Sequence, residues 1–193
     1  QDPQYSDNDG AMNQSAGNGA SVILSNSTNE TSDITIGVDV SKFQGTIDWA
    51  QAASSGVDFA MIRVGYRAQK TGVIYADTNA KYNMQQAAAN GIKVGVYFFS
   101  SAVNEAEAIE EADWVADFIA DYSITYPVAF DCEGFNTSES RQKSMTKAER
   151  TDVAVAFLQE IYDKGYTPMF YAACSELTNN CLLYTSPSPR DRG

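Results

Sequence analysis

Residues 94–99 read VGVYFF, an apolar run without a charged side chain. A strand with one face in water carries polar residues at every second position, whereas a strand covered on both faces stays apolar throughout. Parallel strands that are joined by helices are covered in this way. The run therefore indicates a parallel sheet, and we expect strands and helices to alternate on either side of it.

Four further runs have the length and composition of buried strands. They are residues 36–40, 57–64, 127–131 and 167–171, and residues 92–99 make the fifth strand. The segments between them have helical periodicity. The order strand, helix, strand, helix predicts an α/β fold.

The four expected helices carry recognisable end signals. Two begin with capping-box spacing, Asn104 with Glu107 and Thr146 with Glu149. The other two cover roughly residues 48–54 and 77–90. Glycine, which tolerates the left-handed conformation that ends many helices, follows three of them, at Gly56, Gly91 and Gly165.

An open sheet and a barrel share this local pattern, and motifs help to choose between them. The sequence contains no GxGxxG turn after its first strand and no GxxxxGK[ST] loop, so the dinucleotide and P-loop folds lack support. We therefore favour a barrel.

Composition excludes several kinds of chemistry. The 193 residues include no histidine, which removes Ser-His-Asp and Cys-His catalysis and the usual zinc proteases. The net charge of −12 makes nucleic acid an unexpected partner, and no apolar stretch reaches the about 18 residues that a membrane span needs. We expect no cofactor and no metal site. Carboxylates must then supply any acid or base.

Carboxylates stand at the ends of two expected strands, where barrel enzymes place their chemistry. Asp39 lies in GVDVSKFQG, and Asp131 and Glu133 lie in VAFDCEG. Side chains two residues apart on a strand share a face, with Cα atoms roughly 6 to 7 Å apart. Such pairs can cleave glycosidic bonds, because one acid donates a proton while the other stays ionised. Taken alone, each could also cap a helix or accept a structural hydrogen bond.

Several ordered blocks resemble the glycoside hydrolase family 25 lysozymes, the Chalaropsis-type muramidases. The blocks are residues 37–49 (GVDVSKFQGTIDW), 59–67 (FAMIRVGYR), 91–102 (GIKVGVYFFSSA) and 127–134 (PVAFDCEG). The resemblance implies an irregular TIM-like (β/α) barrel of eight strands, of which about five are present. It also implies hydrolysis of the β-1,4 bond between N-acetylmuramic acid and N-acetylglucosamine in bacterial peptidoglycan.

The resemblance also assigns roles to residues. Glu133 matches the general acid, Asp131 its partner carboxylate, and Asp39 an acid that lines the catalytic cleft. Two retaining routes stay open, in which either the N-acetyl oxygen of the substrate or Asp131 attacks.

Three further residues are candidates for binding substrate. Tyr97 and Tyr171 resemble cleft-lining positions of the family, since aromatic faces pack on sugar rings; for Tyr97 a structural role is an equal alternative. Arg63 also recurs in such lysozymes, although an arginine there more often neutralises buried carboxylates than it binds substrate.

Two other functions can be weighed against a lysozyme. A non-catalytic module that binds cell-wall carbohydrate would have no need for the three acids. A chitinase-like barrel also ends its fourth strand in DxE, but it carries a further aspartate two residues earlier, where this chain has Ala129.

We expect three regions along the chain. Residues 1–33 are rich in Ser, Asn, Gly and Asp and predict a flexible linker. Residues 34–180 form a partial family 25 domain. Residues 181–193 look non-native, because they resemble the translation of a sequencing-library adapter. The domain would then lack its last strands.

The remaining expectations concern location, association and cysteines. The linker and the resemblance predict an extracellular or cell-wall-associated bacterial protein that acts as a monomer, with no signal peptide in this chain. Cys132 should point away from Asp131 and Glu133 as a small buried side chain, and a bridge to Cys174 is the minor alternative.

Overall fold

The structure, a computed structural model, describes residues 35–134, 137–138 and 140–173. The chain divides into two units, Gln1–Ile34 and Thr35–Gly193, and every described residue belongs to the second. The linker predicted over residues 1–33, the tail predicted over 181–193 and Cys174 lie outside the described residues.

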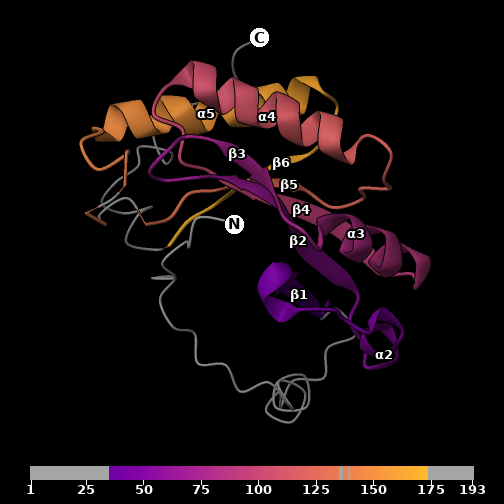
Figure 1. The fold of residues 1–193 in the computed structure, drawn as a ribbon. Helices are drawn as coiled ribbons and strands as arrows, with labels where there is room; N and C mark the ends of the chain where they lie inside the picture. The colour runs from indigo at the N-terminus through magenta and orange to yellow at the C-terminus, as the bar shows by residue number, and fades with distance from the viewer. Residues whose placement is uncertain (1–34, 135–136, 139, 174–193) are drawn as a thin grey trace, which may run out of the picture. The chain divides into compact units, whose positions relative to one another are not determined.

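A mostly parallel sheet organises the described chain (Figure 1). Its strands are β1 (Gly37–Val40), β2 (Phe59–Arg67), β3 (Ile74–Ala76), β4 (Lys93–Phe99), β5 (Val128–Asp131) and β6 (Pro168–Tyr171). They lie in the order β1-β2-β4-β5-β6, all parallel, and β3 pairs antiparallel with β2. The five predicted strands are confirmed. β3 could not be predicted from the sequence, because three residues carry too little periodicity to be recognised.

Four α-helices connect the strands, and their ends follow the predicted signals. They are α2 (Trp49–Ser54), α3 (Ala80–Ala89), α4 (Glu105–Ile119) and α5 (Lys147–Asp163); a short 3₁₀ helix, η1 (Lys42–Gln44), follows β1. Gly91 after α3 and Gly165 after α5 have φ angles of 77° and 89°, the left-handed region that favours glycine.

The two predicted capping boxes differ in the structure. At α5 the box is complete, because Thr146 accepts from the amide of Glu149 and the Glu149 carboxylate accepts from the amide of Thr146. At α4 only the first half forms: Asn104 accepts from the amide of Glu107, but the Glu107 carboxylate accepts from Val103 and from Arg141 instead. A distant arginine therefore competes with the local cap.

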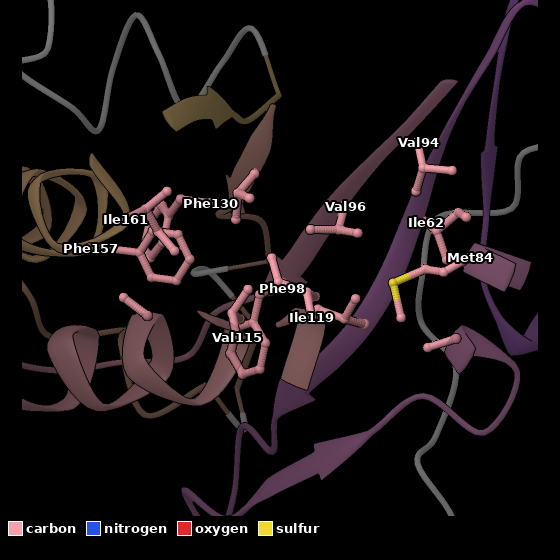
Figure 2. Packing of buried hydrophobic residues seen from close by; sticks show 14 of the residues in the cluster. Ile62, Met84, Val94, Val96, Phe98, Val115, Ile119, Phe130, Phe157 and Ile161 are labelled. Atoms are coloured by element: carbon pink, nitrogen blue, oxygen red, sulfur yellow. The ribbon is translucent and has the colours of Figure 1, made fainter. Parts of the chain in front are cut away.

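The hydrophobic core lies between the sheet and its helices (Figure 2). In Figure 1, α4 and α5 lie side by side along the sheet, and they also pack on each other. Alternate strand residues reach this core together with residues of every α-helix: Val40, Ile62, Val96, Phe98 and Phe130 from the strands, and Trp49, Met84, Val115 and Phe157 from the helices. Trp49 and Phe98 are among the largest buried side chains of this core.

The strand residues between the core positions lie on the opposite face of the sheet. Asp39 precedes Val40, Tyr97 lies between Val96 and Phe98, and Asp131 follows Phe130. On the face of VGVYFF opposite the core, Gly95 and Phe99 are buried and Tyr97 is partly exposed. The fold is α/β as predicted. Within the described chain β1 and β6 are the ends of the strand order, so closure into a barrel stays a prediction.

A β-bulge in β2 changes which side chains face the core. Arg63 pairs with Tyr97, but the register then shifts and Gly65 pairs with Phe98. After the shift Tyr66 pairs with Phe99 and shares the face of Arg63, whereas Arg67 reaches α4. The bulge thus supplies one aromatic residue to the polar face and one cation to the helix side.

Candidate active site

The candidate residues lie on one face of the sheet, toward the ends of neighbouring strands. Asp39 is on β1, Arg63 on β2 and Tyr97 on β4, while Asp131 and Tyr171 are the last residues of β5 and β6. The register pairs Arg63 with Tyr97, and Asp131 with Tyr171. Glu133 follows Asp131 by two residues. The carboxyl ends of parallel strands meet at one edge, which is the reason that these distant residues gather.

Backbone hydrogen bonds fix the end of β5 on both sides. The amide of Ser100, after β4, donates to the carbonyl of Asp131 at 2.9 Å, and the amide of Cys132 donates to the carbonyl of Tyr171 at 3.0 Å. The Cys132 side chain packs in the hydrophobic core, as predicted. Asp131 itself is buried and Glu133 is partly buried. The two acids are therefore held by a strand that cannot easily shift.

The pKa of the Tyr171 hydroxyl is sensitive to all three candidate carboxylates. Its pKa is raised above the ordinary value, first by the charge of Glu133, then by burial, and then by the charges of Asp131 and Asp39. One hydroxyl thus feels all three predicted acids. All three acids therefore lie close enough to Tyr171 to act on its hydroxyl.

Asp39 is tied to Tyr97 by a side-chain hydrogen bond. Although the residue keeps exposed surface, the protein atoms around its carboxyl remove water, and this desolvation raises the pKa of Asp39. The Tyr97 hydrogen bond and the charge of Arg63 act in the opposite direction. The pKa of Tyr97 is raised by burial and by the charge of Asp39. Tyr97 therefore stays protonated and donates to Asp39.

Arg63 has a second carboxylate partner that the sequence did not reveal. Its Nε donates to Oδ2 of Asp77 at 3.0 Å, and its terminal nitrogen lies 3.0 Å from the same oxygen. The same atom of Asp77 also accepts from the amide of Lys42. Asp77 had the position of a helix-start residue, so nothing in the local sequence pointed to this role. Arg63 does neutralise a buried carboxylate, as expected; contact with substrate stays a prediction.

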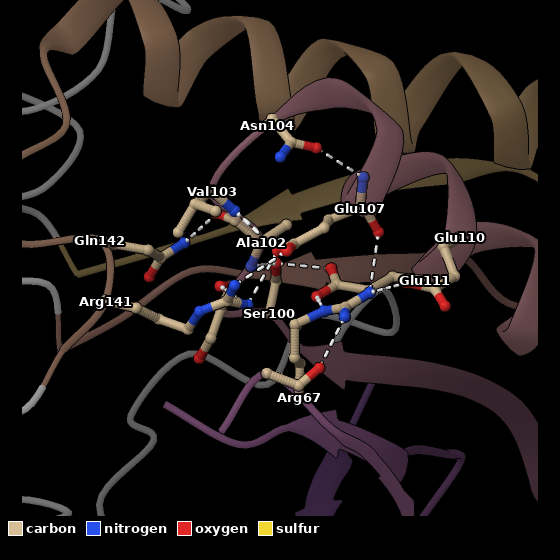
Figure 3. A network of polar contacts seen from close by, with 12 residues as sticks. Arg67, Ser100, Ala102, Val103, Asn104, Glu107, Glu110, Glu111, Arg141 and Gln142 are labelled. Atoms are coloured by element: carbon tan, nitrogen blue, oxygen red, sulfur yellow. Dashed lines mark hydrogen bonds and ion pairs between the residues drawn. The ribbon is translucent and has the colours of Figure 1, made fainter. Parts of the chain in front are cut away.

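A separate polar network joins β2 and the residue after β4 to helix α4 (Figure 3). Arg67 donates to Glu111 at 2.7 Å and to Glu110 at 2.7 Å, and the hydroxyl of Ser100 donates to Glu111 at 2.6 Å. Burial raises the pKa of Glu111 to about 7, although Ser100 and Arg67 oppose this. Ser100 links this network to the candidate active site. Its amide donates to the backbone carbonyl of Asp131, and its hydroxyl donates to the carboxylate of Glu111.

The segment after Glu133 is fastened to α4 and to the loop that precedes it. Arg141 makes a two-pronged ion pair with Glu107, with both distances 2.8 Å. The side-chain amide of Gln142 donates to the carbonyl of Ala102 at 2.9 Å. Both contacts join residues more than thirty positions apart, and so they could not be read from local patterns.

The described residues offer neither a cluster of metal ligands nor a membrane-spanning helix. No group of three or more His, Cys, Asp or Glu side chains there could hold a metal ion. In the same part of the chain, no helix is both long and apolar enough to cross a membrane.

Comparison with known proteins identifies the family to which the sequence is similar. The model of glycosyl hydrolases family 25 matches residues 38–188. A curated relative, Lysozyme M1 of Streptomyces globisporus, is 34% identical over 80 residues, which are 42% of this chain and 25% of that protein.

Solved structures share the fold. The modular autolysin LytC of Streptococcus pneumoniae aligns with a TM-score of 0.65 and 22% identity, covering 75% of this chain and 33% of that one. The lysozyme of Streptomyces coelicolor aligns with a TM-score of 0.54 and 24% identity, covering 72% and 64%. This chain thus spans a quarter to a third of the length of Lysozyme M1 and LytC.

Proposed function

The chain belongs to glycosyl hydrolases family 25, and from this premise we propose that it is a muramidase. Its substrate is bacterial peptidoglycan, and the bond it cleaves is the β-1,4 bond between N-acetylmuramic acid and N-acetylglucosamine. The observation that carries the proposal is the placement of Asp39 on β1, Asp131 at the end of β5 and Glu133 just beyond it, around the hydroxyl of Tyr171 that pairs in register with Asp131. Glycosidic cleavage uses a pair of carboxyl groups, one as the acid and one as the stabilising carboxylate, and this strand edge supplies such a pair together with a third acid.

Each acid has a distinct role in the proposal. Glu133 donates a proton to the leaving oxygen. Asp131, buried and fixed between β4 and β6, stabilises the positive charge that develops at the anomeric carbon, either by attack or by orienting the N-acetyl group of the substrate. Asp39 lines the site, and the hydroxyl of Tyr97 fixes its orientation.

The proposal extends to location and partners. A wall hydrolase acts outside the cell or within the wall, on a carbohydrate partner and not on nucleic acid. We place the domain at residues 34–180 and expect it to work as a monomer. Arg63, Tyr97 and Tyr171 would contact the glycan.

The test is the clearing of a bacterial wall suspension. We would compare the chain with its Glu133→Gln variant and with a matched variant at an exposed acid, Glu105→Gln. A chimera that continues after Tyr171 with the C-terminal part of a longer family 25 protein would be measured beside it. We expect clearing by the parent or the chimera, loss of at least a hundredfold with Glu133→Gln, and no change with Glu105→Gln.

Two results would contradict the proposal. Clearing that survives Glu133→Gln would remove the acid from the mechanism. Binding to walls without clearing, by both folded proteins, would favour the carbohydrate-binding module instead.

A further inference from the structure

Phe43 is a large apolar side chain that stays exposed beside the candidate active site. It lies in η1, directly after β1 and four residues beyond Asp39, and 44% of its surface is accessible. An aromatic ring costs free energy when water covers it, so an exposed ring next to catalytic carboxylates suggests a ligand that covers it.

The turn that carries Phe43 is held in place before any ligand arrives. The amide of Ser41 donates to Oε1 of Gln44 at 2.7 Å, and the amide of Phe43 donates to Oγ of Ser41 at 3.3 Å. The amide of Lys42 donates to buried Asp77 at 3.0 Å. A ligand that packs on Phe43 would therefore lose little free energy in ordering the turn.

Two cations accompany the ring. Cζ of Arg63 lies 4.9 Å from the centre of Phe43 and 5.6 Å from that of Tyr66, and Nζ of Lys42 lies 5.5 Å and 5.8 Å from the same centres. The two cations differ in their partners. Arg63 is buried and paired with Asp77, whereas Lys42 is partly exposed and forms no ion pair with any carboxylate of the described residues. Lys42 thus has a charge available for a ligand.

This patch, Lys42 with Phe43 and Tyr66, borders the candidate acids through Arg63. The charge of Arg63 acts on both Asp39 and Tyr97, and the same guanidinium lies against both rings. The patch therefore adjoins the candidate acids, and a glycan that extends past Asp39 along this side would meet it.

We propose that Phe43 and Lys42 form a subsite for a sugar that bears a carboxylate, namely the muramyl unit. The pyranose ring stacks on Phe43, and the carboxylate of the lactyl group, or of the peptide attached to it, pairs with Nζ of Lys42. The inference rests on the proposed function. It adds that the ammonium group of Lys42 selects for a substrate with a carboxylate. N-acetylglucosamine carries no carboxylate, so Lys42 favours muramyl glycan over chitin fragments.

The experiment measures binding with turnover removed. Calorimetry on proteins that carry Glu133→Gln would compare two soluble ligands, a tetrasaccharide of alternating N-acetylglucosamine and N-acetylmuramic acid, and the uncharged chitotetraose. Lys42→Met keeps the length of the side chain and removes its charge. The matched control is Lys81→Met, since Lys81 is an exposed lysine whose Nζ lies 5.4 Å from the ring of Phe118, away from the site.

We expect Lys42→Met to weaken the muramyl ligand roughly three- to tenfold, the effect of one partly exposed ion pair, and to leave chitotetraose unchanged. Phe43→Ala should weaken both ligands, because both stack on the ring. Lys81→Met should change neither.

Other outcomes would overturn the inference. Equal effects of Lys42→Met on both ligands, or none on either, contradict the carboxylate contact while clearing by the active protein still supports a muramidase. Absence of muramyl binding in the parent, together with absence of clearing, overturns the proposed function and the subsite together.

Discussion

The hydrogen bond between Tyr97 and Asp39 lowers the pKa of an acid at the candidate active site, against a larger opposite effect of desolvation. Two effects compete at Asp39: desolvation raises its pKa, and the Tyr97 hydroxyl together with Arg63 lowers it. A donor that binds the ionised carboxylate favours that form. Tyr97 therefore has an electrostatic role in addition to any contact with substrate.

Replacement of Tyr97 by phenylalanine should raise the pKa of Asp39 further, because the donor is lost while the desolvation stays. The carboxyl carbon of Asp39 can be followed by NMR titration. Tyr126→Phe is the matched control, since Tyr126 stacks on Phe59 at the other end of the strands. A pKa of Asp39 that falls or stays constant in Tyr97→Phe would contradict this account.

The sequence revealed the acids of the site but not their supports. Asp39, Asp131 and Glu133 could be found because polar residues that end apolar runs stand out. Asp77 could not, since it pairs with Arg63 fourteen residues away and resembled a helix-start residue. The exposure of Phe43 was equally hidden, because no local pattern distinguishes a buried from an exposed aromatic residue.

The N-terminus of α5 illustrates local stabilisation that a sequence does specify. Thr146 and Glu149 satisfy two backbone amides reciprocally. Thr146→Ala should lower the free energy of unfolding by about 1 kcal/mol, because one of these amides loses its partner. Urea unfolding measures the change. Thr125→Ala, an exposed threonine outside the helices, should leave the free energy nearly constant, and an equal loss in both variants would exclude capping as the cause.

The buried acid of α4 makes the stability depend on pH. The pKa of Glu111 is raised from 4.5 to about 7 in the folded chain. Between these values the folded state holds a proton that the unfolded state has released, so the free energy of unfolding falls as the pH rises from about 4.5 to 7. Glu111→Gln should remove this decline.

Urea unfolding at pH 5 and pH 8 would measure the change in slope. Glu105→Gln, at an exposed acid of the same helix, should keep the decline of the parent. A decline that persists unchanged in Glu111→Gln would assign the proton to another group.

The elements missed by the sequence share a physical cause. β3 depends on pairing with β2 and not on its own composition. The bulge after Arg63 depends on the fit of β2 against β4, and it decides that Tyr66 lies on the face of Arg63 while Arg67 lies on the helix side. Strand partners decide both features. The helices could be predicted because the residues that mark each helix end lie within a few positions of one another in the sequence.

The charge of the entire chain opposes its proposed substrate. The net charge is −12, and bacterial walls carry phosphate polymers that are also anionic. Long-range repulsion slows the approach of like charges, and salt screens it with a Debye length of about 10 Å at 0.1 M. The site must therefore hold the glycan against this repulsion.

We expect the rate of wall clearing to increase when salt is raised from about 0.01 M to 0.1 M, because the repulsion is screened over shorter distances. Hydrolysis of a short soluble muramyl glycan, which carries none of the phosphate polymers of the wall, serves as the control and should respond much less. A clearing rate that falls over the same range would mean that a local basic surface, and not the net charge, governs the approach to the wall.

The alternation along the strands has a consequence for how this protein can diverge. Packing against the helices constrains Val40 and Phe130. The chemistry proposed for the other face constrains their neighbours Asp39 and Asp131. Since adjacent positions face different demands, substitutions can accumulate in one set while the other is inherited intact. Descendants of such a chain could exchange one glycan for another and keep the same scaffold.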